Sequence, residues 1–444
     1  MIDLLAGACV LIALAGVILI TKLNAKHLSA EGSRKIIHIT MGCLTLTFPF
    51  IFAYRQSVVY LGIIAIAALL SIRLNKRLRH GIGSALLNIQ RESFGEIYFV
   101  VSVVVVFVLH ESAFQYLIPI AVLTFADSVA ALIGTSYGRY SLSHKNEDAK
   151  SSEGSVMFFI VAFICALIPL QLMTDIGRAE VLVISFLIGI LAAIIEIVCS
   201  RGGDNLLLPI LTYSILLYNI NQPLRSIFIN LAVMAALLVL GIVVYKLTGI
   251  TKISVAYSFL VAYIAMTQGG VTWVLPPLML FLTFGILPMM KDEEKRLTHT
   301  SNVIECNTTV GIIWLVASVF FPRYRDIFYI SFALAFACHL AINTYSRLIN
   351  YKAARTLPAV ICAFLKATVF ISLPVLIITR MSLFTLVLYT VFLILILPCT
   401  VFLNRKTNYN YESFNPLRLR AYKVAVGALT AAFAITLTTF GGCL

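Results

Sequence analysis

The sequence predicts an all-α fold, a polytopic transmembrane helical bundle of about sixteen spans in two halves. Of its 444 residues, 61% are hydrophobic and 12% are charged, whereas soluble domains average about 45–50% apolar and about 25% charged residues. The apolar residues form continuous runs instead of alternating with polar ones, which favours membrane helices over the strands of a β-barrel. This composition excludes a water-soluble enzyme, a disordered chain and a fibrous protein.

A helical span needs about 20 mostly apolar residues. Candidate spans begin near residues 2, 36, 57, 97, 113, 155, 179, 205, 226, 253, 271, 304, 326, 356, 382 and 421. The first run, Ile2 to Ile20, has no basic region before it and no small-residue cleavage site. We therefore expect a retained first span and not a cleaved signal peptide.

The basic residues predict the topology of these spans. With the N-terminus outside, the inner loops hold 26 of the 33 Lys and Arg residues, and three of these lie in a loop over residues 346–355. The outer loops hold six, and Lys366 lies within a span. This asymmetry follows the positive-inside rule and predicts sixteen spans with both termini outside.

Charge and cysteine content exclude two other classes of function. The net charge is +14, but no basic stretch is interleaved with aromatic residues, so we expect lipid contacts and no nucleic-acid partner. The nine cysteines include no CxxC pair, and most lie in apolar runs, which predicts buried thiols instead of disulfides or a zinc site.

The carboxylates divide the chain into two expected domains. Residues 1–220 hold 13 of the 19 Asp and Glu residues, and two of these, Asp127 and Glu196, fall within predicted spans. A carboxylate in lipid is costly and is usually retained for a functional site. We therefore expect residues 1–220 to form a catalytic membrane domain and residues 221–444 a second membrane domain, which is a scaffold or carries a site of another kind.

Two candidate segments lie in or near the predicted spans that begin near residues 36 and 113. Arg34, Lys35 and His38 begin one span, where Arg34 and His38 share a helix face; an interfacial basic anchor is the alternative. Asp127 precedes the pair Gly134 and Gly138. Such glycines permit close helix packing or the approach of backbone to a phosphate, and Asp127 alone is also consistent with a satisfied intramembrane hydrogen bond.

A third segment mixes cations, hydroxyls and a carboxylate before the span near residue 155. Lys145 and Lys150 can neutralise phosphates, and the free N–H groups of a helix start bind anions. The surrounding residues are Ser151, Ser152, Glu153, Gly154 and Ser155. The alternative is a solvated loop with an N-cap.

A fourth segment places Glu196 at the end of one span and Asp204 and Asn205 at the start of the next, after a Gly-Gly turn. Carboxylate and amide oxygens at a membrane face suit Mg²⁺, and a turn with an Asp or Asn cap is the alternative. The four segments combine acidic and basic groups on one side of the membrane, as phosphoryl transfer to a lipid hydroxyl requires.

These segments resemble the CTP-dependent polyprenol kinase family, which includes phytol kinase, dolichol kinase and the CTP-using diacylglycerol kinase. The matching pieces, in family order over residues 30–215, are Arg34-Lys35-x-x-His38, Gly95-Glu96, Asp127-Ser-x-Ala-x-x-x-Gly134-x-x-x-Gly138, Lys150-Ser-x-Glu153-Gly154-Ser155 and Glu196 followed by Asp204-Asn205-x-x-x-Pro209. The resemblance implies transfer of the γ-phosphoryl group of CTP to a membrane lipid alcohol, with Mg²⁺, at the cytoplasmic face of an integral protein of a bacterial inner membrane.

The resemblance, together with residue chemistry, gives each candidate a role. Asp127, Glu153, Asp204 and Asn205 would place the metal and the nucleotide phosphates, with Asp127 and Asp204 as metal ligands. Arg34, Lys35, Lys145 and Lys150 would neutralise phosphate charge beside Gly134, Gly138, Ser151, Gly154 and Ser155. His38 or Glu196 would act as general base or substrate positioner.

Two other functions stay open. Phosphatidate cytidylyltransferases share the stretch from Asp127 to Ser155, but Ser200-Arg-Gly-Gly-Asp204-Asn205 is closer to the kinases. Sixteen spans in two halves also suit a transporter or a lipid scramblase. The sequence does not indicate which lipid alcohol is used or the oligomeric state.

Residues 246–350 faintly resemble the membrane family that contains phytyl-phosphate kinase. Gln268-Gly-Gly270-x-x-Trp273 and Asn302-x-x-x-x-Asn307 carry the resemblance, and Ala337-Cys-His339-Leu-Ala-Ile-Asn343 stands where that family has an acidic motif. The missing carboxylates imply a non-catalytic domain. Lys366, a lysine within a span, is a candidate for binding a lipid phosphate, and snorkelling is the alternative.

Overall fold

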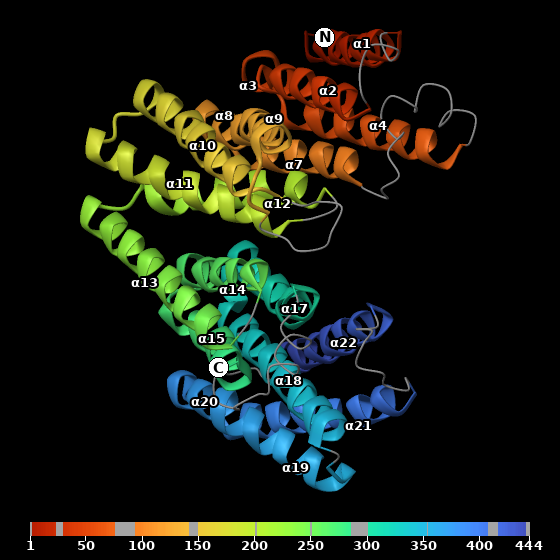
Figure 1. Cartoon of the computed structure of the whole chain (residues 1–444), viewed down its shortest axis with the longest axis vertical. Helices are drawn as coiled ribbons and strands as arrows, with labels where there is room; N and C mark the ends of the chain where they lie inside the picture. Colours follow the sequence, from red (N-terminus) through yellow and green to blue (C-terminus); the bar gives the residue numbers. More distant parts are fainter. Residues whose placement is uncertain are drawn as a thin grey trace. The chain divides into compact units, whose positions relative to one another are not determined.

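The computed structural model describes residues 2–23, 30–75, 94–141, 150–199, 202–248, 251–285, 301–352, 354–406 and 416–440 (Figure 1). Within these ranges the regular secondary structure is helical, and a single isolated bridge joins Ser141 to Ser151. The fold is therefore all-α, as the composition and the continuous apolar runs predict.

The chain divides into two compact units, residues 1–232 and residues 233–444. The division falls within α13 (Leu224–Thr248), whereas the boundary expected from the carboxylates, after residue 220, lies at the end of α12 (Asp204–Ile220). Each unit is described by itself below.

Helices α10 and α11 lie side by side and form the core of the first unit (Figure 1). Besides α12 and the first part of α13, its other elements are α1 (Ile2–Leu23), α2 (Ala30–Thr45), α3 (Phe48–Ile51), α4 (Arg55–Leu74), α7 (Gly95–Leu109), α8 (Ala113–Ala121), the π-helix η1 (Val122–Ala126) and α9 (Asp127–Tyr137). α10 spans Ser152–Met173 and α11 spans Arg178–Val198. Apolar side chains of α11 such as Ile184, Leu187 and Leu191 are fully buried, which holds the polar ends of α10, α11 and α12 at fixed positions.

The second unit is built around α18 (Arg325–Lys352), which α15, α17, α19, α21 and α22 contact (Figure 1). The elements of this unit besides α18 are α14 (Lys252–Ile264), the π-helix η2 (Ala265–Gly269), α15 (Val271–Gly285), α17 (Ser301–Phe320), the 3-10 turn η3 (Pro322–Tyr324), α19 (Thr356–Ala367), the π-helix η4 (Thr368–Ser372), α20 (Leu373–Thr379), α21 (Leu383–Lys406) and α22 (Pro416–Phe440). Residues Phe332 to Leu340 of α18 are all almost completely buried.

A helix occurs at each of the sixteen predicted segments, but the predicted number of spans is too high. Ten helices of the described residues are long and apolar enough to cross a membrane, and four more apolar helices are shorter. α7, for example, has 15 residues and is about 22 Å long, less than the hydrocarbon thickness of about 30 Å. These helices identify the chain as a membrane protein. The assignment of its loops to the inner or outer side of the membrane stays a prediction.

Candidate functional site

Asp127 lies directly after a break in regular α-helical geometry. α8, η1 and α9 form one continuous 25-residue apolar segment, and its middle turn, Val122–Ala126, is a π-helix. Pro119 in the preceding turn has no N–H group to donate to the helix ladder. Single π-turns within α-helices are frequent at functional sites, and here the π-turn sets the direction in which Asp127 begins α9.

α2 packs against this π-turn through a glycine. A Cβ atom on Gly42 would lie 2.1 Å from Oγ1 of Thr124, so the two helices approach where no side chain intervenes. Lys35, His38 and Gly42 are spaced i, i+3 and i+7 and therefore share one face of α2. This close contact brings the two polar side chains to the start of α9.

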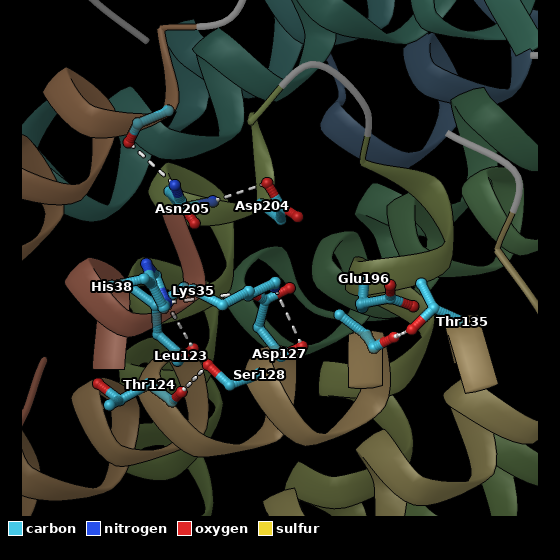
Figure 2. Close-up of polar contacts among 12 residues, drawn as sticks. Lys35, His38, Leu123, Thr124, Asp127, Ser128, Thr135, Glu196, Asp204 and Asn205 are labelled. Carbon is cyan, nitrogen blue, oxygen red and sulfur yellow. Dashed lines mark hydrogen bonds and ion pairs between the residues drawn. The ribbon is translucent and has the colours of Figure 1, made fainter. Parts of the chain in front are cut away.

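Lys35 and His38 both reach the Asp127 region (Figure 2). Nζ of Lys35 lies 2.6 Å from Oδ2 of Asp127. Nε2 of His38 lies 3.2 Å from the backbone oxygen of Leu123 and 3.8 Å from the same carboxylate oxygen. The predicted grouping of Lys35, His38 and Asp127 is thus brought together, through the face that Lys35 and His38 share.

A second ion pair joins the adjacent ends of α10, α11 and α12. Nζ of Lys150, just before α10, lies 2.7 Å from Oε1 of Glu196 and 3.9 Å from Oδ2 of Asp204. It also donates to the backbone oxygen of Glu196. Burial alone would lower the pKa of Lys150, but the carboxylates of Glu196 and Asp204 and, more weakly, Asp127 raise it above its ordinary value.

The two ion pairs belong to one electrostatic cluster. The charge of Asp127 acts on Lys150, and Glu196 interacts with both Asp127 and Asp204. Three carboxylates thus face two ammonium groups, besides His38. Oε2 of Glu196 is buried and has no hydrogen-bond partner among the described residues. A buried carboxylate oxygen without a donor is costly and is open to a ligand.

The predicted glycines form a packing contact between α9 and α10. A Cβ on Gly134 would meet Oγ of Ser151 at 3.0 Å, and one on Gly154 would meet the backbone oxygen of Ala130 at 2.9 Å. A Cβ on Gly138 would lie 2.3 Å from the backbone oxygen of Gly134. The Gly-x-x-x-Gly pattern therefore serves close helix packing, the first of its two expected uses, and phosphate contact by these glycines stays a prediction.

The side chains at the start of α10 cap helices. Oγ of Ser151 accepts the N–H of Gly154 at 3.1 Å, which is the N-cap expected as the alternative reading. The carboxylate of Glu153 accepts the N–H groups of Arg139 at 3.1 Å and Tyr140 at 3.5 Å. Glu153 thus ties the end of α9 to α10, whereas the ion pairs that Lys150 makes within the described residues are with Glu196 and Asp204. Oγ of Ser155 is buried without a partner among the described residues.

The remaining predicted residues have three different outcomes. Nδ2 of Asn205 donates to the backbone oxygen of Gly95 at 2.9 Å, so its amide holds α12 against the start of α7 (Figure 2). Arg34 lies on α2, but its side chain is outside the described part of the structure. Lys145 lies outside the described residues altogether.

Within the described residues no three His, Cys, Asp or Glu side chains stand close enough to form a metal site by themselves. The cluster instead offers single carboxylates separated by lysines. This donor set fits Mg²⁺, which commonly takes one or two protein carboxylates and completes its shell with water and substrate phosphates. Asp127 and Asp204 stay the predicted ligands.

Sequence reasoning missed two features that build this site. One is the π-turn, which leaves the Leu123 carbonyl as a partner for His38; Pro119 inside an apolar span was the available signal. The other is Gly42, which had no motif to mark it and gains its role only from the packing of α2 on Thr124.

The comparisons with known proteins give no relative for this chain: no family model, no curated protein and no solved structure matches it. The class defined by fold and composition is a polytopic helical membrane protein with a buried cluster of acidic and basic groups. Its activity is therefore argued from that cluster.

Proposed function

We propose that the first unit is a CTP-dependent kinase that phosphorylates a lipid alcohol, such as an isoprenoid alcohol or diacylglycerol, at the cytoplasmic membrane face. One observation supports this above all others. Lys150 draws Glu196 and Asp204 together, and the Lys35–Asp127 pair belongs to the same electrostatic cluster. Phosphoryl transfer needs this combination of cations for the phosphates and carboxylates for a metal and a proton.

The two lysines are suited to hold phosphate oxygens. Each side chain is largely buried, with exposed fractions of 16% for Lys35 and 19% for Lys150, so an ion pair there is weakly screened. In the ligand-free arrangement the carboxylates neutralise the ammonium groups. A polyphosphate would take over some of these N–H donors, which gives the nucleotide favourable charge-assisted hydrogen bonds.

Mg²⁺ fits this proposal as the partner of the nucleotide. When bound, Mg²⁺ supplies positive charge to the phosphate oxygens and orients them. Asp127 and Asp204 would hold it, since their carboxylates lie on the two sides of the cluster that Lys35 and Lys150 contact. The two lysines would then be released toward the phosphates.

Glu196 is the better placed of the two candidate proton acceptors. One of its oxygens is bound to Lys150, and the other is buried without a partner among the described residues. Nε2 of His38 is within hydrogen-bond distance of a carbonyl oxygen, which requires a proton on that nitrogen. Oε2 of Glu196 would take the proton of the lipid hydroxyl while the alcohol oxygen bonds to the γ-phosphorus. The bond from that phosphorus to the bridging oxygen breaks, and its electron pair leaves with CDP.

The acceptor is proposed to come from the bilayer because of where the cluster sits. Asp127 and Glu196 both belong to helices that are long and apolar enough to span a membrane. A hydroxyl that reaches them must be carried by a molecule that dissolves among these helices. An amphipathic lipid alcohol meets this condition, whereas a soluble sugar or peptide does not.

The test uses the full chain in membranes with CTP labelled at the γ-phosphate and a mixture of lipid alcohols. Transfer of label into the lipid fraction, together with CDP, is the expected result. Labelled pyrophosphate together with a CDP-lipid would replace the kinase by a cytidylyltransferase. If no nucleotide is consumed while a solute or lipid crosses the bilayer of reconstituted vesicles, the protein is a transporter or scramblase.

A further inference from the structure

The second unit contains a polar stripe on its most buried helix. His339, Asn343 and Arg347 follow one another at intervals of four residues on α18 and therefore lie on one face. His339 is 1% exposed and Arg347 is 8% exposed. Arg347 lies within α18, which continues to Lys352, and not in the inner loop expected over residues 346–355.

Two side chains of this stripe have unused hydrogen-bonding atoms. Nε2 of His339 and Nδ2 of Asn343 have no partner among the described residues. A buried amide N–H without an acceptor costs free energy, and most such groups in folded proteins are paired with protein, water or a ligand. The stripe therefore presents unsatisfied polar atoms next to a buried guanidinium.

A second cation lies close to the stripe. Lys366, on α19, interacts electrostatically with Arg347 and donates to the backbone oxygen of Thr283 at 2.8 Å. α18 and α19 pack side by side. The Thr283 carbonyl belongs to the last turn of α15, where cations are favoured, but a carbonyl does not cancel a full charge.

The described carboxylates of this unit do not compensate Lys366. Glu305 pairs with Lys423 at 2.5 Å. Asp326 is in the first turn of α18, which is about 30 Å along the helix from Arg347 at 1.5 Å per residue. An anion bound beside Lys366 would be attracted by its charge and by the nearby charge of Arg347, since the bundle has a low dielectric constant.

An apolar cavity lies on the same face of α18. Its lining includes Leu237, Phe259, Phe281, Asn307 and Phe336. Phe336 precedes Asn343 by seven residues, two helical turns on the same face. A lipid with a phosphate at Asn343 and Arg347 would reach this apolar lining with its hydrocarbon chain, since Phe336 is about 10 Å along the helix from Asn343.

We propose that Asn343 and Arg347 of α18, with Lys366 of α19, form an anion site in the second unit that binds a phosphate group, carried by a lipid phosphate or free as inorganic phosphate. Arg347 supplies a planar set of donors for phosphate oxygens, Lys366 supplies a second positive charge, and Asn343 supplies an uncharged donor. This site does not depend on the activity proposed for the first unit, because the ligand can be added directly.

The test measures equilibrium binding to the purified full-length protein in neutral detergent by titration calorimetry. The probes are dodecyl phosphate, dodecanol and inorganic phosphate. We expect dodecyl phosphate to bind and dodecanol to bind at least about tenfold more weakly, since loss of a charged hydrogen bond costs that much or more. Inorganic phosphate binding as tightly as dodecyl phosphate would support the site with free phosphate as its ligand.

Three variants test whether the proposed side chains bind the phosphate group. Asn343→Ala and Lys366→Gln each remove one proposed donor, and Arg347→Gln removes the guanidinium. Each should weaken dodecyl phosphate binding at least about tenfold, while Arg380→Gln, at an exposed arginine of the same unit, leaves it unchanged. If Arg347→Gln fails to fold, the other two variants still decide. Equal binding of dodecanol and dodecyl phosphate, or unchanged binding in both Asn343→Ala and Lys366→Gln, would overturn the site.

One further variant separates this site from the proposed kinase. Asp127→Asn removes a carboxylate of the first unit and should lower the rate of label transfer from CTP by about 100-fold or more without changing dodecyl phosphate binding. Loss of binding in Asp127→Asn, in a protein that is still monodisperse, would count against a site confined to the second unit.

Discussion

The ammonium nitrogen of Lys150 lies 2.7 Å from a carboxylate oxygen of Glu196, although the two residues are 46 positions apart. Lys150 stands just before the first residue of α10 and Glu196 stands in the last turn of α11. The two helices run in opposite directions, so the pair closes the end of this hairpin at which Asp204 begins α12. The apolar surfaces of α10 and α11 set the spacing, and the ion pair fixes the polar groups at that end.

This relationship predicts the effect of removing the lysine. Lys150→Met leaves Glu196 buried beside Asp204 without its cation, and breaking a buried ion pair in this way costs about 3–5 kcal/mol. We expect a lower unfolding temperature and no phosphorylation activity. Because both tryptophans, Trp273 and Trp314, lie in the second unit, unfolding should be followed by circular dichroism instead of tryptophan fluorescence.

A double variant is the matched control for this prediction. Lys150→Met with Glu196→Gln removes both charges, so it should recover most of the lost stability while staying inactive. An inactive protein whose stability returns in the double variant identifies the buried charge as the cause. Equal stability of the wild type and the Lys150→Met variant would contradict the pairing.

The cluster could be predicted from sequence only in part. Asp127 and Glu196 stand out because carboxylates are costly inside apolar spans, and Lys150 stands out as a cation before a span; these three do come together. Glu153 and Asn205 lie beside them in the chain, yet they bind backbone groups of neighbouring helices. Sequence spacing places residues at a helix end but does not determine whether a side chain points into the site or caps a neighbouring segment.

The presence of the helices could be predicted from the sequence, but the number of membrane spans and the ends of some helices could not. Long apolar runs define helices reliably, and each predicted segment contains one. The number of spans was overestimated because residues such as those of α12 are apolar enough to suggest a span, while the helix formed has 17 residues. The end of α18 was also misplaced, because Arg347 looks like a loop residue in a count of charges but is buried in the bundle.

The two proposed metal ligands provide the second prediction. Asp127→Asn and Asp204→Asn each keep the shape of the side chain and remove one negative charge, so we expect kcat to fall by about 100-fold or more. Initial rates of label transfer from CTP at several Mg²⁺ concentrations measure this. Excess Mg²⁺ should restore part of the rate in these variants if the lost carboxylate served the metal.

Asp175→Asn is the control for these two substitutions, because Asp175 is an exposed aspartate of the same unit between α10 and α11. It should keep the wild-type rate and Mg²⁺ dependence. Near-normal turnover in both Asp127→Asn and Asp204→Asn would remove these residues from the proposed site.

The raised pKa of Lys150 gives a prediction about pH. The carboxylates of Glu196 and Asp204 outweigh the opposing effect of burial and keep Lys150 protonated above its ordinary pKa of about 10.4. The stability that this ion pair contributes is fully present below about pH 10 and is lost only as the pH rises through the higher folded-state pKa.

We therefore expect Lys150→Arg to leave the alkaline side of the activity profile unchanged between pH 7 and about pH 9.5, since neither side chain loses its proton there. Rates measured across this range for both proteins, with circular dichroism to confirm folding, provide the check. If the wild type loses activity near pH 9 and the arginine variant does not, Lys150 titrates within the working range and the ion pair is weaker than its geometry indicates.

The contact between Gly42 and Thr124 provides the last prediction. A Cβ at position 42 would lie 2.1 Å from Oγ1 and 2.3 Å from Cγ2 of Thr124, so Gly42→Ala must push α2 away from the π-turn. Overpacking of this kind costs about 1–3 kcal/mol. The same displacement pulls Lys35 and His38 away from Asp127, so we expect activity to fall more steeply than stability.

Gly16→Ala is the matched control, because nothing lies within 4 Å of a Cβ built at Gly16 on α1. Adding Thr124→Ala to Gly42→Ala removes the two nearest atoms and should recover part of the activity. Full activity in Gly42→Ala alone would show that the approach of α2 to the π-turn does not position Lys35 and His38 for the reaction.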